Sequence, residues 1–101
     1  MGKTVEDYDA QLMPYRFSYT KAVAQEQWLL AAHWVDLLNS CIHPTFRIID
    51  LPAFEFTPTT LRQQYELESE ARMFCLKYMR LVEQAISLER SKMLQIWKGD
   101  N

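Results

Sequence analysis

Apolar side chains recur every three or four positions between residues 20 and 42, which is the spacing of one face of an α-helix. Polar side chains lie on the opposite face, among them Gln25, His33 and Asp36. The residue before a proline is pushed out of the α region, so this helix ends before Pro44. The pattern predicts an amphipathic helix at about 20–42. Its apolar stripe consists of Ala24, Trp28, Ala31, Val35, Leu38 and Ile42.

A second helical pattern fills the C-terminal part of the chain. Residues 59–98 contain neither glycine nor proline, and Thr57 and Pro58 suit the N-cap and the first position of a helix. These features predict one long helix at about 58–98. At 1.5 Å per residue it would be roughly 60 Å long, whereas a compact domain of this size has a radius of gyration near ~13 Å. The helix is therefore longer than the body that would bury it.

The apolar arc of this long helix is unusually broad. Two apolar rows run side by side, and two neighbours suit such an arc better than one. The helix at 20–42, about 33 Å long, can cover only half of it. The first row is a heptad seam of Leu67, Phe74, Leu81 and Leu88 with Ala71, Tyr78 and Ala85. The second row consists of Cys75, Met79, Val82, Ile86, Met93 and Ile96.

Three arrangements would cover the remaining apolar surface. The long helix could break at the acidic cluster Glu68-Ser69-Glu70 and fold back into an intramolecular bundle. Phenylalanines of the connector at 43–57 could fill the gap, or a second copy of the chain could pair with the helix. Charge favours the second copy, because residues 55–70 carry a net charge of −3 and residues 72–98 carry +4. This order also suits the dipole of a single helix, but it would steer a partner helix into the antiparallel orientation. We therefore predict a helical-bundle dimer with antiparallel long helices.

The segments outside the two helices are less regular. Residues 4–13 suit a short N-terminal helix with Thr4 as its N-cap and Pro14 as its stop. Residues 15–19 alternate between aromatic and polar side chains, which indicates a short strand or an extended lead-in. The connector at 43–57 contains two prolines and three phenylalanines, so we expect an extended aromatic segment packed across the helices, or a strand at 46–50 paired with residues 15–19.

Composition narrows the class of protein. The chain has 101 residues, of which 49% are hydrophobic and 24% charged, so we predict one all-α domain spanning residues 1–101. Its glycines are Gly2 and Gly99, which excludes a glycine-rich phosphate-binding loop. Cys41 and Cys75 lie within helical apolar patterns and are expected to be reduced thiols. No apolar run approaches the length that a bilayer requires, so we expect a cytoplasmic protein without a membrane partner.

No arrangement of residues indicates catalysis. His33 and Asp36 share a polar helix face, but two ligands are too few for a metal site. Glu66 and Glu70 have the spacing seen in di-metal helical bundles, yet no histidine follows His43 to complete such a site. We therefore expect no enzyme activity, no cofactor and no metal.

Two functions fit what remains. The first is a non-catalytic protein-interaction module, such as an adaptor, an inhibitor or a regulatory subunit. Its candidate partner-binding residues are Met93, Leu94, Ile96 and Trp97, which lie beyond the reach of the shorter helix and would otherwise seal the dimer.

The alternative is a nucleic-acid-binding regulator. It would use the aromatic and basic segment Tyr15–Lys21 together with Arg80, Arg90 and Lys92. The net charge of −2, and four basic against six acidic residues in the first half of the chain, favour aromatic packing over this alternative. The sequence does not name the partner protein.

Overall fold

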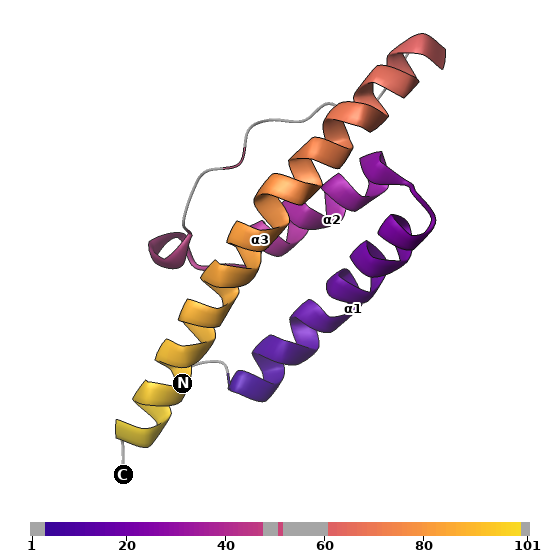
Figure 1. The fold of residues 1–101 in the computed structure, drawn as a ribbon. Helices are drawn as coiled ribbons and strands as arrows, with labels where there is room; N and C mark the ends of the chain where they lie inside the picture. Colours follow the sequence, from indigo (N-terminus) through magenta and orange to yellow (C-terminus); the bar gives the residue numbers. More distant parts are fainter. Residues whose placement is uncertain (1–3, 48–50, 52–60, 100–101) are drawn as a thin grey trace.

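The computed structural model describes residues 4–47, 51 and 61–99, and within these it contains three α-helices, one short 3-10 helix and no strand. The helices are α1 (Val5–Ala24), α2 (Trp28–Ser40) and α3 (Leu61–Gly99), and the 3-10 helix is η1 (Pro44–Phe46). α1 and α2 form an antiparallel hairpin, and α3 runs parallel to α2 along the length of the molecule (Figure 1). The all-α prediction is confirmed.

α1 begins where the sequence predicts a helix and continues far beyond the predicted stop. The hydroxyl of Thr4 accepts a hydrogen bond of 3.0 Å from the backbone N–H of Asp7, so Thr4 is the N-cap. Pro14 lies inside the helix, although an interior proline costs roughly 3 kcal/mol. Burial of Tyr8 and Leu12 before it offsets that cost. The predictions of a stop at Pro14 and of a strand at 15–19 are wrong.

A turn at residues 25–27 divides the helix predicted at 20–42 into the end of α1 and the whole of α2. Gln27 N–H donates to the Ala22 carbonyl at 2.8 Å, and Glu26 N–H donates to the Val23 carbonyl at 3.0 Å. These two bonds form a Schellman motif, which requires a left-handed residue and usually has glycine there. Glu26 takes this position with φ 56°. The sequence pattern hides the turn because the apolar spacing continues across it.

Residues from outside α2 satisfy the backbone groups at its two ends. At its start, the backbone N–H of Trp28 donates to Glu68 Oε2 of α3 at 2.9 Å, where a carboxylate also suits the helix dipole. At its end, Arg47 Nε donates to the Ile42 carbonyl at 3.0 Å, and Arg47 Nη2 donates to the Ser40 carbonyl at 3.4 Å. α2 is therefore held in place by α3 and by the segment after η1.

α3 is a single continuous helix of 39 residues. The alternative of a break at Glu68-Ser69-Glu70 is therefore wrong. The helix continues through this cluster, and the side chain of Glu68 caps α2. The predicted N-cap Thr57 and first helical residue Pro58 lie outside the described residues, as does most of the connector at 43–57. The part of the connector that is described contains η1, so Phe46 lies in a 3-10 turn and not in a strand.

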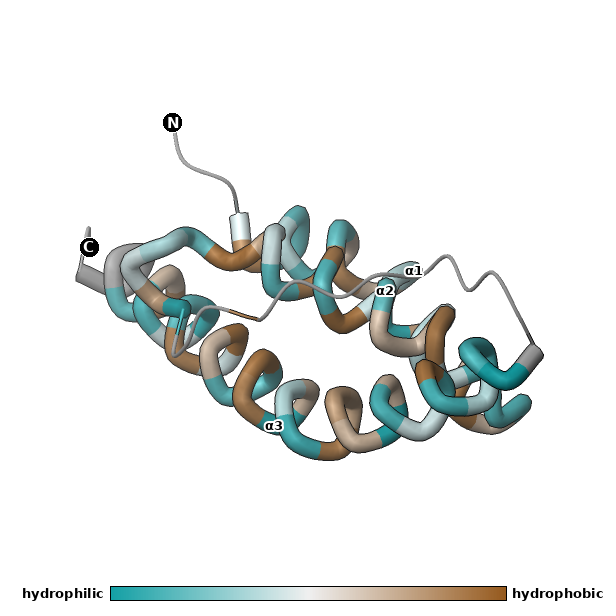
Figure 2. Tube along the Cα trace, turned by 90° about the horizontal axis from the view of Figure 1, so that it is seen from above, coloured by the Kyte–Doolittle hydropathy of each residue, from teal (hydrophilic) through white to brown (hydrophobic). Residues whose placement is uncertain are grey.

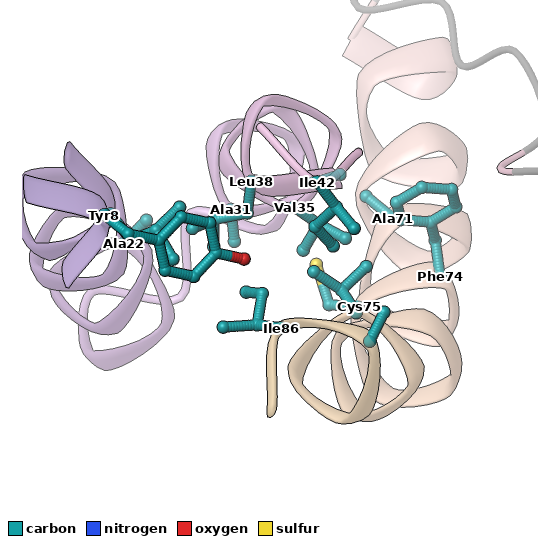
Figure 3. Close-up of a cluster of buried hydrophobic side chains, with 14 residues drawn as sticks. Tyr8, Ala22, Ala31, Val35, Leu38, Ile42, Ala71, Phe74, Cys75 and Ile86 are labelled. Atoms are coloured by element: carbon teal, nitrogen blue, oxygen red, sulfur yellow. The ribbon is translucent and has the colours of Figure 1, made fainter. Parts of the chain in front are cut away.

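The core lies between the three helices, as Figure 3 shows for its buried side chains. α2 is the central element, and its Ala31, Ala32, Val35 and Leu38 are all fully buried. Small side chains also occur on α3, where Ala71 and Ala85 are buried, and they allow the helix axes to approach closely. The buried stripe predicted for the helix at 20–42 is confirmed for Ala31, Val35, Leu38 and Ile42.

The molecule is a rod with principal extents of 58 × 23 × 20 Å. Seen from above, α1 and α2 lie on one side of α3 (Figure 2). The N-terminal helix therefore supplies the second neighbour that the broad apolar arc requires. In the described part of the chain, no element covers the opposite side of α3.

Candidate interaction surface

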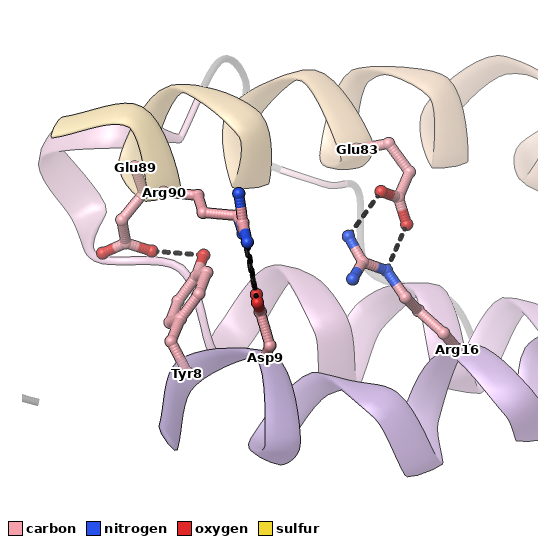
Figure 4. A network of polar contacts seen from close by, with 6 residues as sticks. All are labelled: Tyr8, Asp9, Arg16, Glu83, Glu89 and Arg90. Carbon is pink, nitrogen blue, oxygen red and sulfur yellow. Dashed lines mark hydrogen bonds and ion pairs between the residues drawn. The ribbon is translucent and has the colours of Figure 1, made fainter. Parts of the chain in front are cut away.

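A polar seam joins α1 to α3 (Figure 4). Arg16 forms a bidentate ion pair with Glu83, with nitrogen–oxygen distances of 3.0 and 2.7 Å. Arg90 binds the Asp9 carboxylate at 3.0 Å, and Tyr8 Oη donates to Glu89 Oε1 at 2.6 Å. Sequence reasoning missed all three pairs, because their partners lie more than sixty positions apart.

The seam shifts the ionisation of its members. The hydrogen bond from Arg90 and the charge of its guanidinium lower the pKa of Asp9. Burial raises the pKa of Tyr8 far above its usual value, and the hydrogen bond to Glu89 raises it further. These shifts keep Asp9 ionised, as its ion pair with Arg90 requires, and keep Tyr8 protonated, as its hydrogen bond to Glu89 requires. These residues serve to fasten α1 to α3, and their partners are all internal.

The first apolar row predicted on α3 turns gradually out of the core. Phe74 is buried, Leu81 is half-buried and Leu88 is 57% exposed. A straight α-helix drifts by about 20° per heptad, because 3.6 residues per turn do not divide seven evenly. The second row stays inside, with Cys75, Val82 and Ile86 buried. The prediction of burial along both rows is therefore confirmed for Cys75, Val82 and Ile86 of the second row and wrong for Leu88, whereas the side chain of Ile96 lies outside the described residues.

The side of α3 opposite the core carries two large apolar side chains in addition to charged ones. Met73 is 67% exposed and Leu76 is 61% exposed. Residues before and after them at steps of three and four share this side of the helix. We call this surface the outer face of α3. It consists of Glu66, Ser69, Glu70, Met73, Leu76, Lys77 and Arg80, all of them exposed.

Sequence reasoning missed Met73 and Leu76 as surface candidates. Both lie outside the two apolar rows that were predicted to be buried. An apolar residue outside such a row is expected on the surface, and this is the sequence feature that could have identified them. A shallow depression of about 550 Å³ continues the same side toward the C-terminus, where it is lined by Arg80, Gln84 and Ser87 among others. The outer face is therefore continuous from the acidic start of α3 into its basic second half.

The predicted partner-binding end of α3 is described only in part. Met93 is half-buried and packs against the core, so it belongs partly to the fold. Leu94 is also half-buried, and it lies eighteen residues, or five helical turns, after Leu76. It therefore continues the line of the outer face. Ile96 and Trp97 lie within α3, but their side chains are outside the described residues.

A second apolar site lies on α1. Met13 is 66% exposed and Phe17 is 70% exposed. They line a depression of about 600 Å³ together with Thr20 and the paired residues Arg16 and Arg90. Both arginines belong to ion pairs of the polar seam, so part of the lining of this depression already holds the fold together.

The segment Tyr15–Lys21, the main feature of the nucleic-acid alternative, lies along α1. Tyr15 stacks on Trp34 with ring centroids 5.8 Å apart, and Tyr19 packs against the core. Arg16 is paired with Glu83. Burial raises the pKa of Tyr19 to about 12. Three of the side chains that would stack on bases or bind phosphate are thus used within the fold, and Arg90 is paired with Asp9.

The residues weighed for chemistry are dispersed. His33 and Asp36 are exposed on α2, and among the described residues no three His, Cys, Asp or Glu side chains gather to hold a metal. Cys41 and Cys75 do not form a disulfide. Burial raises the pKa of the Cys75 thiol to about 11, which makes it a poor nucleophile at neutral pH.

Over the described residues, no helix combines the length and the apolar character needed to cross a membrane. Comparison with known protein families, with curated proteins and with solved structures finds no match. The function of the chain has therefore to be inferred from its own residues.

Proposed function

We propose that this protein is a non-catalytic interaction module, an adaptor, an inhibitor or a regulatory subunit, that binds a protein partner through the outer face of α3. The observation that carries the proposal is the exposure of Met73 and Leu76 on a helix whose opposite side already has two neighbours. The core needs neither side chain. Exposed apolar groups rimmed by charged residues are typical of surfaces that bind another protein.

The partners we propose are an unidentified protein and a second copy of the chain with antiparallel long helices. A cytoplasmic setting belongs to the same proposal. It is supported by two cysteines that form no disulfide and by the absence of a disulfide framework in so short a chain. The predicted docking residues Ile96 and Trp97 remain a prediction.

An affinity capture with a matched control tests the proposal. Tagged wild-type protein would be compared with Leu76→Glu on the outer face and with Leu30→Glu on α2, where Leu30 is 44% exposed. Both changes place a carboxylate at an exposed leucine of a helix, so neither removes a side chain from the core. We expect one protein to be retained in stoichiometric amount by the wild type and by Leu30→Glu, and to be lost with Leu76→Glu.

Circular dichroism of each variant would establish that the three proteins are equally helical. Retention of the same protein by Leu76→Glu would contradict the assignment to the outer face. If the wild type retained neither another protein nor an untagged copy in stoichiometric amount, the proposal as a whole would be contradicted.

A further inference from the structure

We infer that the outer face of α3 binds a second copy of this chain, with the two α3 helices antiparallel and a two-fold axis at Met73. The inference rests on the proposed function, because it names the occupant of the same surface. It follows from the charges that remain on that face once the internal contacts of the fold are assigned.

Most charged side chains of α3 that point toward the hairpin have partners there. Glu83 and Arg90 pair with α1, and Glu89 accepts hydrogen bonds from Tyr8 and from the backbone of His43. Glu68 caps α2, and the Arg72 guanidinium lies 5.7 Å from the centre of the Trp28 ring. These groups are therefore not available to orient another molecule.

The charges on the outer face form an ordered pattern. Glu66 and Glu70 precede Met73, and Lys77 and Arg80 follow it. Glu66 has an exposed contact of 3.3 Å with Arg62, and Lys77 Nζ lies 5.3 Å from the centre of the ring of Tyr78, its neighbour on the same helix. No ion pair to Glu70, Lys77 or Arg80 occurs in the part of the chain that the structure describes. The face thus has an acidic half and a basic half, with apolar side chains at the boundary.

An antiparallel pair of such helices is self-complementary. With the axis at Met73, each residue lies opposite the residue that is equally far from Met73 on the other side. Glu66 and Arg80 are both seven positions, or about two turns, from Met73. Ser69 and Lys77 are both four positions away, and Glu70 lies beside Lys77 of the second copy.

The apolar residues occupy the centre of this arrangement. Met73 would contact its own copy across the axis. Leu76, three positions from the axis, would lie level with Glu70 of the second copy and one position from its Ser69. Burial of Met73 and Leu76 supplies the apolar contribution to binding. The Glu66–Arg80 and Glu70–Lys77 pairs, each present twice by symmetry, set the orientation. A parallel pair would place like charges opposite each other at every one of these positions, so the charge pattern disfavours it.

The shape of the molecule leaves room for this contact. Glu68 lies beside the first residue of α2, so the turns of α3 before it extend past the hairpin. Tyr65 on this free end is 79% exposed. A second α3 lying along residues 62–84 would cover the part of the helix that α1 and α2 leave bare.

Charge reversal and sedimentation equilibrium test the inference. We expect the wild type to form a concentration-dependent dimer. The variants Glu66→Arg/Glu70→Lys and Lys77→Glu/Arg80→Glu should each self-associate at least tenfold more weakly, because attraction becomes repulsion at every pair. An equimolar mixture of the two variants, and the quadruple variant that carries all four changes, should both recover the wild-type affinity.

Disulfide cross-linking then tests the orientation. In a Cys41→Ser background, a mixture of Glu66→Cys and Arg80→Cys should form a linked dimer, whereas Glu66→Cys alone should not. Linkage of Glu66→Cys to itself would indicate parallel helices and overturn the inference. So would a dimer that tolerates both charge reversals.

A wild-type chain that stays monomeric up to its solubility limit would overturn the inference while leaving the proposed function standing, if the capture experiment yields a different protein. A third outcome is possible: the wild type captures an untagged copy, Leu76→Glu abolishes this capture, and the Glu66→Cys and Arg80→Cys variants form no disulfide-linked dimer. That result would support the proposed function and reject this geometry.

Discussion

The contact between Asp9 and Arg90 illustrates how single residues connect α1 to α3. The guanidinium approaches the carboxylate with both Nε and Nη2, at 3.0 to 3.2 Å. Both side chains are partly exposed, so solvent screens the attraction and the pair serves mainly to set the register of the helices. The hydrogen bond from Arg90 lowers the pKa of Asp9 below its usual value.

This shift predicts a pH dependence. Because the pKa of Asp9 is lower in the folded state, the pair stabilises the fold above the unfolded pKa of about 3.9, and the stabilisation is lost as the pH falls through the lowered folded value. Urea unfolding of wild type and Asp9→Asn should therefore differ in free energy at pH 7, and the difference should shrink from about pH 5 downward. A difference that is constant with pH would contradict this role.

At the level of the single residue, sequence reasoning correctly identified Thr4 as a cap and most of the buried positions of α2 and α3. It did not find the pairs of the polar seam. A helical pattern states which side chains share a face, but the partner across a helix interface depends on the register between two helices, and periodicity carries no information about register.

The turn between α1 and α2 matters most at the level of the element. Glu26 adopts a left-handed conformation, which costs a residue with a Cβ atom about 1–2 kcal/mol relative to the right-handed region. The Schellman hydrogen bonds to Ala22 and Val23 and the packing of the hairpin hold it there. The sequence analysis predicted one helix across this point because glycine, the residue that usually marks the end of a helix, is absent here.

Replacing Glu26 by glycine should therefore stabilise the protein. We expect Glu26→Gly to raise the free energy of unfolding by about 1 kcal/mol, less than the full conformational cost because glycine also gains entropy in the unfolded chain. Denaturant titration with Gln25→Gly as the control measures this, since Gln25 has negative φ and its replacement should destabilise. A loss of stability in Glu26→Gly would show that its side chain matters more than its backbone.

Pro14 is the opposite case: the sequence contains a signal for the end of a helix, but the helix continues. Its presence predicts the end of a helix, yet α1 runs through it. Leu12, two residues before it, is part of the core, and Tyr15, directly after it, packs against the core. Burial of the apolar side of α1, with Tyr8, Leu12 and Ala22, outweighs the single lost hydrogen bond. A rule based on Pro14 and its neighbours alone does not include this contribution.

For the whole molecule, the placement of α1 changes the argument about partners. Sequence reasoning counted one short helix beside a long apolar one and expected a second chain to complete the core. α1 supplies that cover on the hairpin side, since Val82, Ile86 and Tyr8 are buried within one chain. The apolar side chains that remain exposed include Met73 and Leu76 of the outer face of α3, which a second copy would use without being needed for folding.

A monomer should accordingly remain folded. The charge-reversed variant Glu66→Arg/Glu70→Lys, studied at concentrations where it is monomeric, should keep the helical circular dichroism of the wild type and unfold in one cooperative transition. Mutation of a core residue such as Leu38→Ala provides the comparison, with an expected loss of about 2–5 kcal/mol. Loss of helicity on dissociation would show that the dimer is obligatory.

The sequence by itself determined that the chain is helical, that its C-terminal part favours a long helix, and which side of α2 is buried. These properties follow from propensity and periodicity, which act over a few residues. Only the tertiary structure decided where the hairpin turns, that Pro14 is tolerated, and which apolar side chains of α3 remain exposed. Those outcomes depend on the sum of burial over three packed helices, and contacts between residues far apart in the chain set that sum.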